Sequence, residues 1–262
     1  MKLQIHATLD YELPGPTDML LHMEAAHLPE QSVSNAVLTL SPCEHFARVA
    51  AQDEIGERIF LRTQGRFTAD YRATVDIARV LADVSGLEAL PAHRLPGETV
   101  QYMLDSHYCP ANQFRSFVEA EFGTLSGGPR IAAMRDFIKR RFRYVHGSSN
   151  SETTALETFV RREGVCRDFA HMLITMARAS TIPARIASVY AVGVDPPDFH
   201  AVAEVFLDGG WHLVDATGMA TAGQMAKIGI GRDAADVAFL TSFGPVCMIS
   251  QTVDVRVVEP AE

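Results

Sequence analysis

The sequence is short of the features that mark membrane, secreted and nucleic-acid-binding proteins. It has no apolar run near the roughly 18 residues that a membrane-spanning helix needs. Its 23 lysines and arginines are outnumbered by 32 aspartates and glutamates, and a net charge of −9 argues against non-specific binding of nucleic acid. The first residues, MKLQIHATLDYELPG, alternate between apolar and polar instead of forming the apolar core of a signal peptide. We therefore expect a cytoplasmic protein without membrane or nucleic-acid partners.

Cysteine is also scarce. The four cysteines, Cys43, Cys109, Cys166 and Cys247, lie far apart and form no CxxC pair. This spacing argues against a disulfide framework and against a structural zinc site, which uses clustered ligands. We expect Cys43, Cys109 and Cys247 to be small buried apolar residues, and we expect neither a metal nor another cofactor.

The first hundred residues have the pattern of an antiparallel β-sandwich. From Leu3 to Tyr11, apolar and polar residues alternate strictly. Turn residues separate the β-like runs that follow at intervals of roughly ten residues. These runs are MLLHMEA, SNAVLTLSP, HFARVAAQD, ERIFLRTQG and FTADYRATVDI.

The pattern changes near Asn112. Residues 86–110 are rich in proline, glycine and histidine and resemble a linker, whereas residues 112–122 and 129–144 have helical spacing. Strand-like runs return after Pro183. The sequence thus predicts an α+β protein: a β-sandwich domain with its linker in residues 1–110, and a domain with an antiparallel sheet in residues 111–262.

The cysteine of GVCRDF, Cys166, stands where a helix is predicted to begin. Apolar residues recur after it at helical spacing: Phe169, Met172, Leu173 and Met176. The free N–H groups of a first helical turn and the helix dipole favour a thiolate at this point. Asp168, in the same turn, most simply complements the dipole. Cys166 is therefore a candidate nucleophile.

Two further residues fall on one face of a predicted hairpin. His200 begins the run HAVAEVFL, Asp215 lies in WHLVDAT, and Asp208-Gly209 between them is a strong two-residue turn signal. Counting outward from that turn pairs Val202 with Asp215, so His200 shares their face. Such diagonal neighbours lie about 7–8 Å apart at the backbone, a gap that two polar side chains can bridge.

Cys166, His200 and Asp215 have the residue types of a nucleophile, a base and an orienting carboxylate. In this hypothesis Asp215 fixes the tautomer of His200, His200 takes the Cys166 proton, and the Cys166 N–H helps to hold the oxyanion. Each residue also has a simpler interpretation, as a core thiol, a strand histidine or a strand-end carboxylate. The three could also be metal ligands, so spacing alone leaves the triad open.

The stretch GVCRDFAHMLITMARASTIPARIASVY, followed by DFHAVAEVFLDGGWHLVDATG, resembles the transglutaminase-like superfamily, in particular its bacterial cysteine protease type. The shared elements are a Gly-x-Cys, a helix ending in Pro-Ala-Arg, a strand beginning His-Ala and a Trp-x-x-x-Asp strand. The resemblance implies a papain-like fold, in which the Cys-bearing helix packs on an antiparallel sheet after an N-terminal β-sandwich. It implies that Cys166 is the nucleophile, His200 the general base and acid, and Asp215 the orienting residue.

Two positions depart from the family pattern. Val202 stands where an aromatic residue often follows His-Ala, and Ala216 stands where a proline often follows the aspartate. Neither change removes a reacting group, but both alter the surroundings of the acyl group.

The leading functional hypothesis is a cysteine-dependent peptidase or amidase acting on a protein or peptide through a thioester. A transglutaminase shares that intermediate but must exclude water and admit an amine, and no residue identifies such a tunnel. A non-catalytic peptide-binding module of the same fold is a further alternative. The sequence has no acidic loop suited to calcium, and it leaves the oligomeric state open.

Overall fold

The alternating N-terminal residues form one long strand, β1 (Lys2–Leu21). The structure is a computed structural model that describes residues 1–258. From Leu3 to Tyr11 the apolar side chains are buried and the polar ones reach solvent, as the pattern predicts. The strand continues into the next predicted run, MLLHMEA, as far as Leu21, and forms a single element of 20 residues. In the same way, ERIFLRTQG and FTADYRATVDI form β4 (Glu57–Ile77), of 21 residues.

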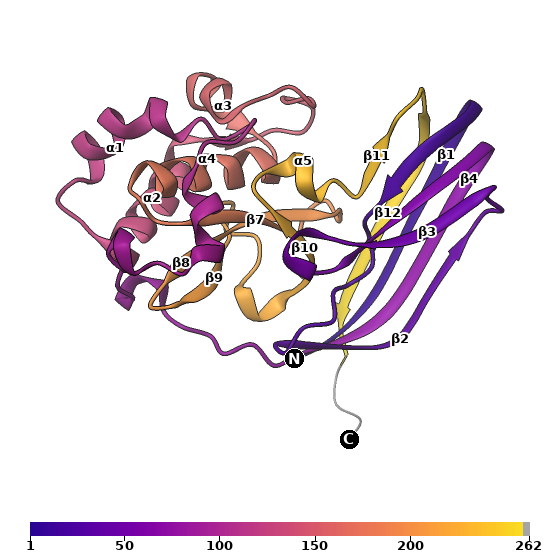
Figure 1. The fold of residues 1–262 in the computed structure, drawn as a ribbon, viewed down its shortest axis with the longest axis horizontal. Coiled ribbons are helices and arrows are strands. Elements are labelled where there is room, and N and C mark those ends of the chain that lie inside the picture. Colours follow the sequence, from indigo (N-terminus) through magenta and orange to yellow (C-terminus); the bar gives the residue numbers. More distant parts are fainter. Residues whose placement is uncertain (259–262) are drawn as a thin grey trace.

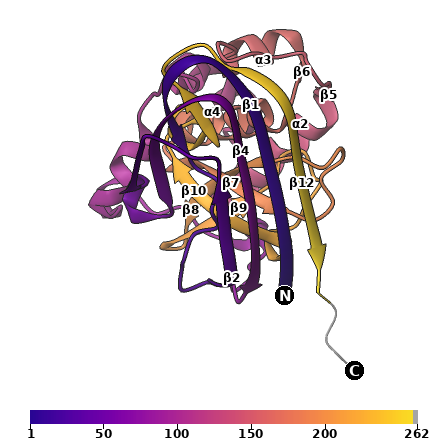
Figure 2. The same cartoon turned by 90° about the vertical axis from the view of Figure 1, so that its right-hand side faces the viewer.

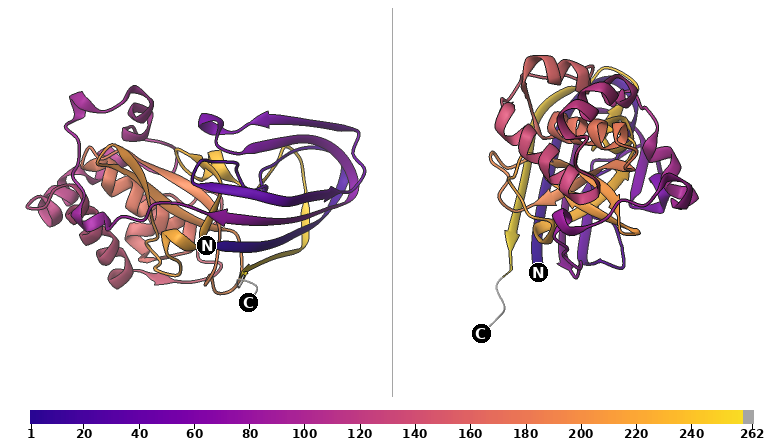
Figure 3. Two further views of the ribbon diagram at one scale, coloured as in Figure 1. Left: turned by 90° about the horizontal axis from the view of Figure 1, so that it is seen from below. Right: turned by 90° about the vertical axis from the view of Figure 1, so that its left-hand side faces the viewer.

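These two strands are the centre of a six-stranded antiparallel sheet (Figure 1). Its other strands are β2 (Gln31–Leu40), β3 (His45–Ala50), β11 (Leu240–Ser242) and β12 (Cys247–Val257). Both long strands bend (Figure 2, Figure 3), where the register shifts between Leu13 and Thr17 and where Gly65 has a φ of 70°. The antiparallel β region that the sequence predicts is thus a sheet that bends over one shared core.

The C-terminal strands return to this first sheet. β11 and β12 both pair with β1, and Val257 lies opposite Leu3. The predicted division into residues 1–110 and 111–262 assigns these strands to the second part, whereas in the structure they complete the first sheet. A period-two pattern identifies a strand and its buried face, but it does not identify the partner strand.

A second antiparallel sheet, with strand order β10-β7-β8-β9, follows the linker. Its strands are β7 (Ala184–Ala191), β8 (His200–Leu207), β9 (Gly210–Val214) and β10 (Met225–Gly231). The helices are α1 (Arg115–Phe122), α2 (Gly127–Arg141), α3 (Ala155–Arg161), α4 (Cys166–Ala179) and α5 (Ala234–Val237). α4 lies against β7 and β8 (Figure 1), and apolar side chains of the three elements share one core, which confirms the predicted α+β class. No helix in residues 1–258 has both the length and the apolar character that crossing a membrane requires.

A buried polar contact joins the two sheets. The side-chain amide of Gln31 donates to the carbonyl of Lys227 and accepts from its N–H, each at 2.8 Å, much as a neighbouring strand would. Beside it, Arg185 and Lys227 form ion pairs with the buried carboxylate of Glu204. The ring of Tyr190 from β7 belongs to the core of the first sheet. The first sheet is therefore fixed beside the second.

Candidate active site

Cys166 is the first residue of α4, as the sequence predicts. Asp168 holds this helix start, because its buried carboxylate accepts a hydrogen bond of 2.8 Å from the N–H of Val165. Gly164 gives that carboxylate room: a Cβ at this position would lie 2.6 Å from the Cβ of Asp168. The glycine and the aspartate of GVCRDF thus fix the turn that presents the thiol.

Replacing Gly164 with alanine should lower the free energy of unfolding by about 1–3 kcal/mol, the usual cost of overpacking. The added methyl group forces Asp168 away and weakens its bond to the helix start. Denaturant unfolding of the variant measures the effect. Gly97→Ala is the matched control, because a Cβ there meets no atom within 4 Å. Equal stability of the two variants would contradict this account.

His200 and Asp215 meet because the predicted hairpin has the predicted register. Leu207 pairs with Gly210, and the ladder continues to Ala203 opposite Val214, one residue before Asp215. Asp208 and Gly209 form the turn with φ values of 50° and 77°, the left-handed pair typical of a tight hairpin. Nε2 of His200 lies 3.0 Å from Oδ2 of Asp215.

The carboxylate of Asp215 is held from several sides. It accepts hydrogen bonds from the N–H and hydroxyl of Thr217 and from the N–H groups of Met219 and Ala220, at 2.7–3.1 Å. Burial alone would raise the pKa of Asp215, but the bonds from His200, Thr217 and Ala220 outweigh burial and lower it. The group that orients His200 is therefore charged and rigid.

His200 is buried, and its two ring nitrogens have different surroundings. Nε2 faces Asp215, whereas Nδ1 has no hydrogen-bond partner within residues 1–258. Burial lowers the pKa of His200, but the contacts with Asp215 and Cys166 outweigh burial and raise it to about 9. The imidazole can therefore carry a proton beside the thiol at neutral pH.

Cys166 and His200 line one cleft of about 340 Å³. Most of the other lining residues are apolar, and they come from β7, from the start of β8 and from the segment that includes α5. Asp215 lies behind His200, away from the lining. The structure thus brings together the three residues that the sequence singles out.

Tyr144 is a candidate that the sequence analysis missed. It lies in β5 (Arg143–Tyr144), which pairs with β6 (Glu163–Gly164), so Tyr144 stands opposite the glycine of the motif. Burial raises the pKa of Tyr144, and a negative charge on Cys166 raises it further. The helical spacing of residues 129–144 predicts a helix that reaches Tyr144, but α2 ends at Arg141.

Two other histidines of this domain, His171 and His212, are not part of the cleft lining. His171 is buried, accepts a hydrogen bond from the N–H of Ala234 and stacks on Tyr108. Burial lowers the pKa of His171 to about 3. His212 lies within hydrogen-bond distance of the Leu207 carbonyl, at 3.2 Å.

The prediction of three buried structural cysteines is correct only for Cys109. Burial raises the pKa of its thiol to about 12. Cys43 is half-buried and Cys247 is exposed, because Cys43 lies in the connection from β2 to β3 and Cys247 begins the edge strand β12. All four thiols are free.

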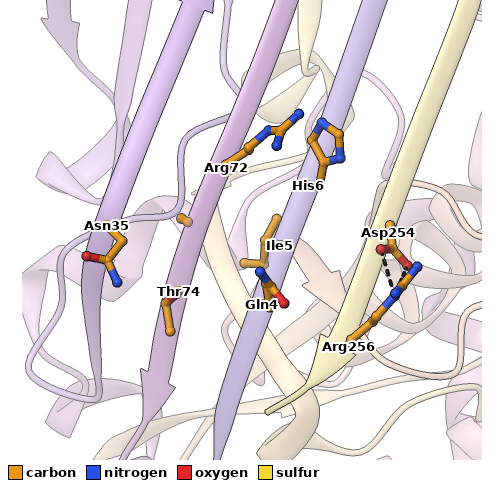
Figure 4. A pocket seen from close by; sticks show the side chains of 9 residues that line it. Gln4, Ile5, His6, Asn35, Arg72, Thr74, Asp254 and Arg256 are labelled. Carbon is orange, nitrogen blue, oxygen red and sulfur yellow. Dashed lines mark hydrogen bonds and ion pairs between the residues drawn. The ribbon is translucent and has the colours of Figure 1, made fainter.

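A second hollow, of about 460 Å³, lies on the outer face of the first sheet (Figure 4). Polar side chains of β1, β2, β4 and β12 line it, and Arg256 pairs with Asp254. His6 and Arg72 both lie 3.0 Å from Asp70. Its lining contains no thiol and its charges are paired, so the cleft at Cys166 is the candidate active site.

Comparisons with known proteins support this choice of cleft. The family model of the transglutaminase-like superfamily matches residues 119–216, which include all three candidate residues. A crystal structure of a "Putative Cysteine Protease" from Cytophaga hutchinsonii is 31% identical in sequence, with a TM-score of 0.94. The match covers 100% of this chain and 92% of that chain.

Two curated mycobacterial relatives match over shorter stretches. An uncharacterized protein of Mycobacterium leprae is 28% identical over 116 residues, which are 41% of each chain. An uncharacterized protein of Mycobacterium tuberculosis is 38% identical over 72 residues, or 26% of this chain and 23% of that one. The matches thus span less than half of these relatives. The Cytophaga hutchinsonii relative is similar over the whole chain, and the family model matches the region that contains the three candidate residues. The chain therefore belongs to the transglutaminase-like superfamily.

Proposed function

We propose that this protein is a cysteine hydrolase of amide bonds in proteins or peptides. The observation that carries the proposal is the cleft that Cys166 shares with His200, whose other ring nitrogen is held by the buried carboxylate of Asp215. A thiol at a helix N-terminus beside an oriented imidazole is the arrangement that activates a cysteine nucleophile.

In the first half of the reaction, the Cys166 thiolate attacks the amide carbon and the carbonyl oxygen becomes an oxyanion. The N–H of Cys166, in the first helical turn, and the hydroxyl of Tyr144 are the donors we propose for this oxyanion. The imidazolium of His200 then gives its proton to the leaving nitrogen, the C–N bond breaks, and a thioester remains on Cys166.

In the second half, water attacks the thioester. Neutral His200 takes one proton of the water, the C–S bond breaks, and the acid product leaves. The recovered thiolate and imidazolium restore the starting state. Asp215 holds the imidazole in one tautomer throughout and stabilises its positive charge.

We prefer hydrolysis to transamidation because the Cytophaga hutchinsonii relative is named a "Putative Cysteine Protease". An amine in place of water would give a cross-linking transglutaminase by the same thioester. Residues 1–258 contain no group of three or more His, Cys, Asp or Glu placed to hold an ion. A cytoplasmic location remains a proposal from the sequence.

The test is product analysis by mass spectrometry after incubation with a peptide library, with and without a primary amine. We expect new peptide termini that depend on Cys166, and little incorporation of the amine. Cys166→Ala should abolish the products, whereas Cys247→Ala, at an exposed thiol on the first sheet, should not change them. Amine-linked glutamine as the main product would establish the transglutaminase, and products that survive in Cys166→Ala would overturn the proposal.

Replacing Tyr144 with phenylalanine should lower kcat about 10²-fold, the scale expected for the loss of one oxyanion donor. KM should change little, because the hydroxyl acts on charge that develops in the transition state. Steady-state kinetics measures the split. Tyr108→Phe is the control, since its hydroxyl donates instead to the carbonyl of Ser151. An unchanged kcat in Tyr144→Phe would remove this residue from the mechanism.

A further inference from the structure

The cleft beside Cys166 has a small-residue floor and apolar walls. Ser188 and Ala201 lie opposite each other on β7 and β8 and form part of the lining. Their short side chains leave space that larger residues would fill. The apolar residues around that space are Val165, Ile186, Phe199, Ala234, Val237, Ala238 and Phe239. The cleft volume falls in the range of about 300–1,000 Å³ that is usual for ligand sites.

The first sheet holds one wall of this cleft. The carbonyl of Phe239 accepts a hydrogen bond of 2.9 Å from the N–H of His22, just after β1. The next residue, Leu240, pairs with Leu21 of that strand. The ring of Phe239 stacks on Phe199, with centroids 4.6 Å apart and planes within 8°. The wall is therefore built across both sheets and placed directly beside His200.

The two charged side chains at the cleft, Arg167 and Asp198, form hydrogen bonds with neutral groups. Arg167 donates to the carbonyl of Asn150 and to the hydroxyl of Ser149. Asp198 accepts from the N–H of Phe199 and from the side chain of Gln251 on β12. A charged or amide side chain that entered this mostly apolar cleft would lose water, which is costly.

We propose that this cleft is the subsite for one large apolar side chain of the peptide, such as leucine or phenylalanine, beside the attacked amide. The proposal rests on the proposed function, because it takes Cys166 as the attacking group. It gives the first sheet a role in substrate selection through Phe239. An apolar subsite would also distinguish this protein from a transglutaminase, whose pocket must receive glutamine.

Peptidyl chloromethyl ketones test the subsite, since the Cys166 thiolate displaces chloride and forms a thioether that intact mass measures. The probes are dipeptides in which leucine, phenylalanine, alanine, glutamine or aspartate occupies each position in turn. Each rate is divided by the rate with iodoacetamide, which carries no side chain. At one position of the dipeptide, we expect the normalised rate with leucine or phenylalanine to exceed the rate with alanine by about 10-fold or more. It should exceed the rate with aspartate by about 100-fold.

Two variants fill the cleft from different sides. Ala201→Leu acts from the floor and Ala238→Leu from the wall, where the side chain is exposed and the fold is less at risk. Both should lower the normalised rate with leucine or phenylalanine about 10-fold and affect the alanine probe much less. Ala47→Leu, on β3 and outside the cleft lining, is the control that should match the wild type.

The outcomes separate the two proposals. If Cys166 reacts fast with iodoacetamide but shows no preference for apolar probes, the subsite proposal is wrong and the reactive thiol is still supported. The same holds for an apolar preference that the two variants leave intact. A preference for glutamine does the same. A Cys166 that reacts with iodoacetamide no faster than exposed Cys247 overturns the proposed function, and the subsite falls with it.

Discussion

Replacing Asp215 with asparagine should lower kcat about 10²-fold or more, because the neutral amide no longer stabilises the positive charge of His200. The change keeps the size of the side chain and leaves an oxygen to accept from the backbone N–H groups of Met219 and Ala220. The fold should therefore survive while the imidazolium of His200 loses its charged partner. Asparagine is a better choice than alanine, which would leave those N–H groups without an acceptor.

The matched control is Asp208→Asn on the same hairpin. Asp208 lies in the turn, and Asn-Gly forms such turns as readily as Asp-Gly. We expect wild-type kcat in this control and an unchanged circular dichroism spectrum in both variants. If Asp215→Asn retained more than a tenth of the wild-type kcat, the proposed role of the Asp215 charge would be wrong.

Replacing His200 with alanine should lower kcat by about 10²- to 10⁴-fold, the usual contribution of a general acid and base. It should also abolish alkylation of Cys166 by iodoacetamide near pH 6, because the imidazolium partner of the thiolate is gone. Peptide-by-peptide mass spectrometry over a pH series measures the alkylation. Exposed Cys247 supplies the ordinary thiol in the same sample. His212→Ala, on β9, is the control.

The same residue should give stability a definite dependence on pH. The pKa of His200 is raised from 6.5 to about 9 in the folded protein. Its protonated form therefore stabilises the fold fully below pH 6.5, and this contribution is lost as the pH rises through 9. The shift corresponds to a contribution on the order of 3 kcal/mol. Unfolding free energies at pH 6 and pH 10 should show this difference in the wild type and lack it in His200→Ala.

A wild-type Cys166 that reacts at pH 6 no faster than Cys247 would argue against the thiolate–imidazolium pair. The same holds for a His200→Ala variant with an unchanged alkylation profile. In either case a peptide-binding module of the same fold would become the leading hypothesis. An Asp215→Ala variant should weaken low-pH alkylation less than His200→Ala, because the imidazole and the helix N-terminus both remain.

The sequence by itself determined the local parts of the site. The apolar spacing after Cys166 predicts a helix that begins at the thiol, and α4 begins there. Asp208-Gly209 predicts the turn and therefore the register that carries His200 toward Asp215. Both follow from short-range rules, since helix starts and tight turns depend on residues only a few positions apart.

The tertiary structure decided the contacts between distant segments. β12 pairs with β1, the pairing of β5 with β6 places Tyr144 opposite Gly164, and His22 holds the wall at Phe239. Alternation tells which face of a strand is buried, but strand partners are selected by packing of the whole core, and that selection has no local signature. For this reason the reacting residues follow from local sequence, whereas the shape of the cleft around them depends on the complete fold.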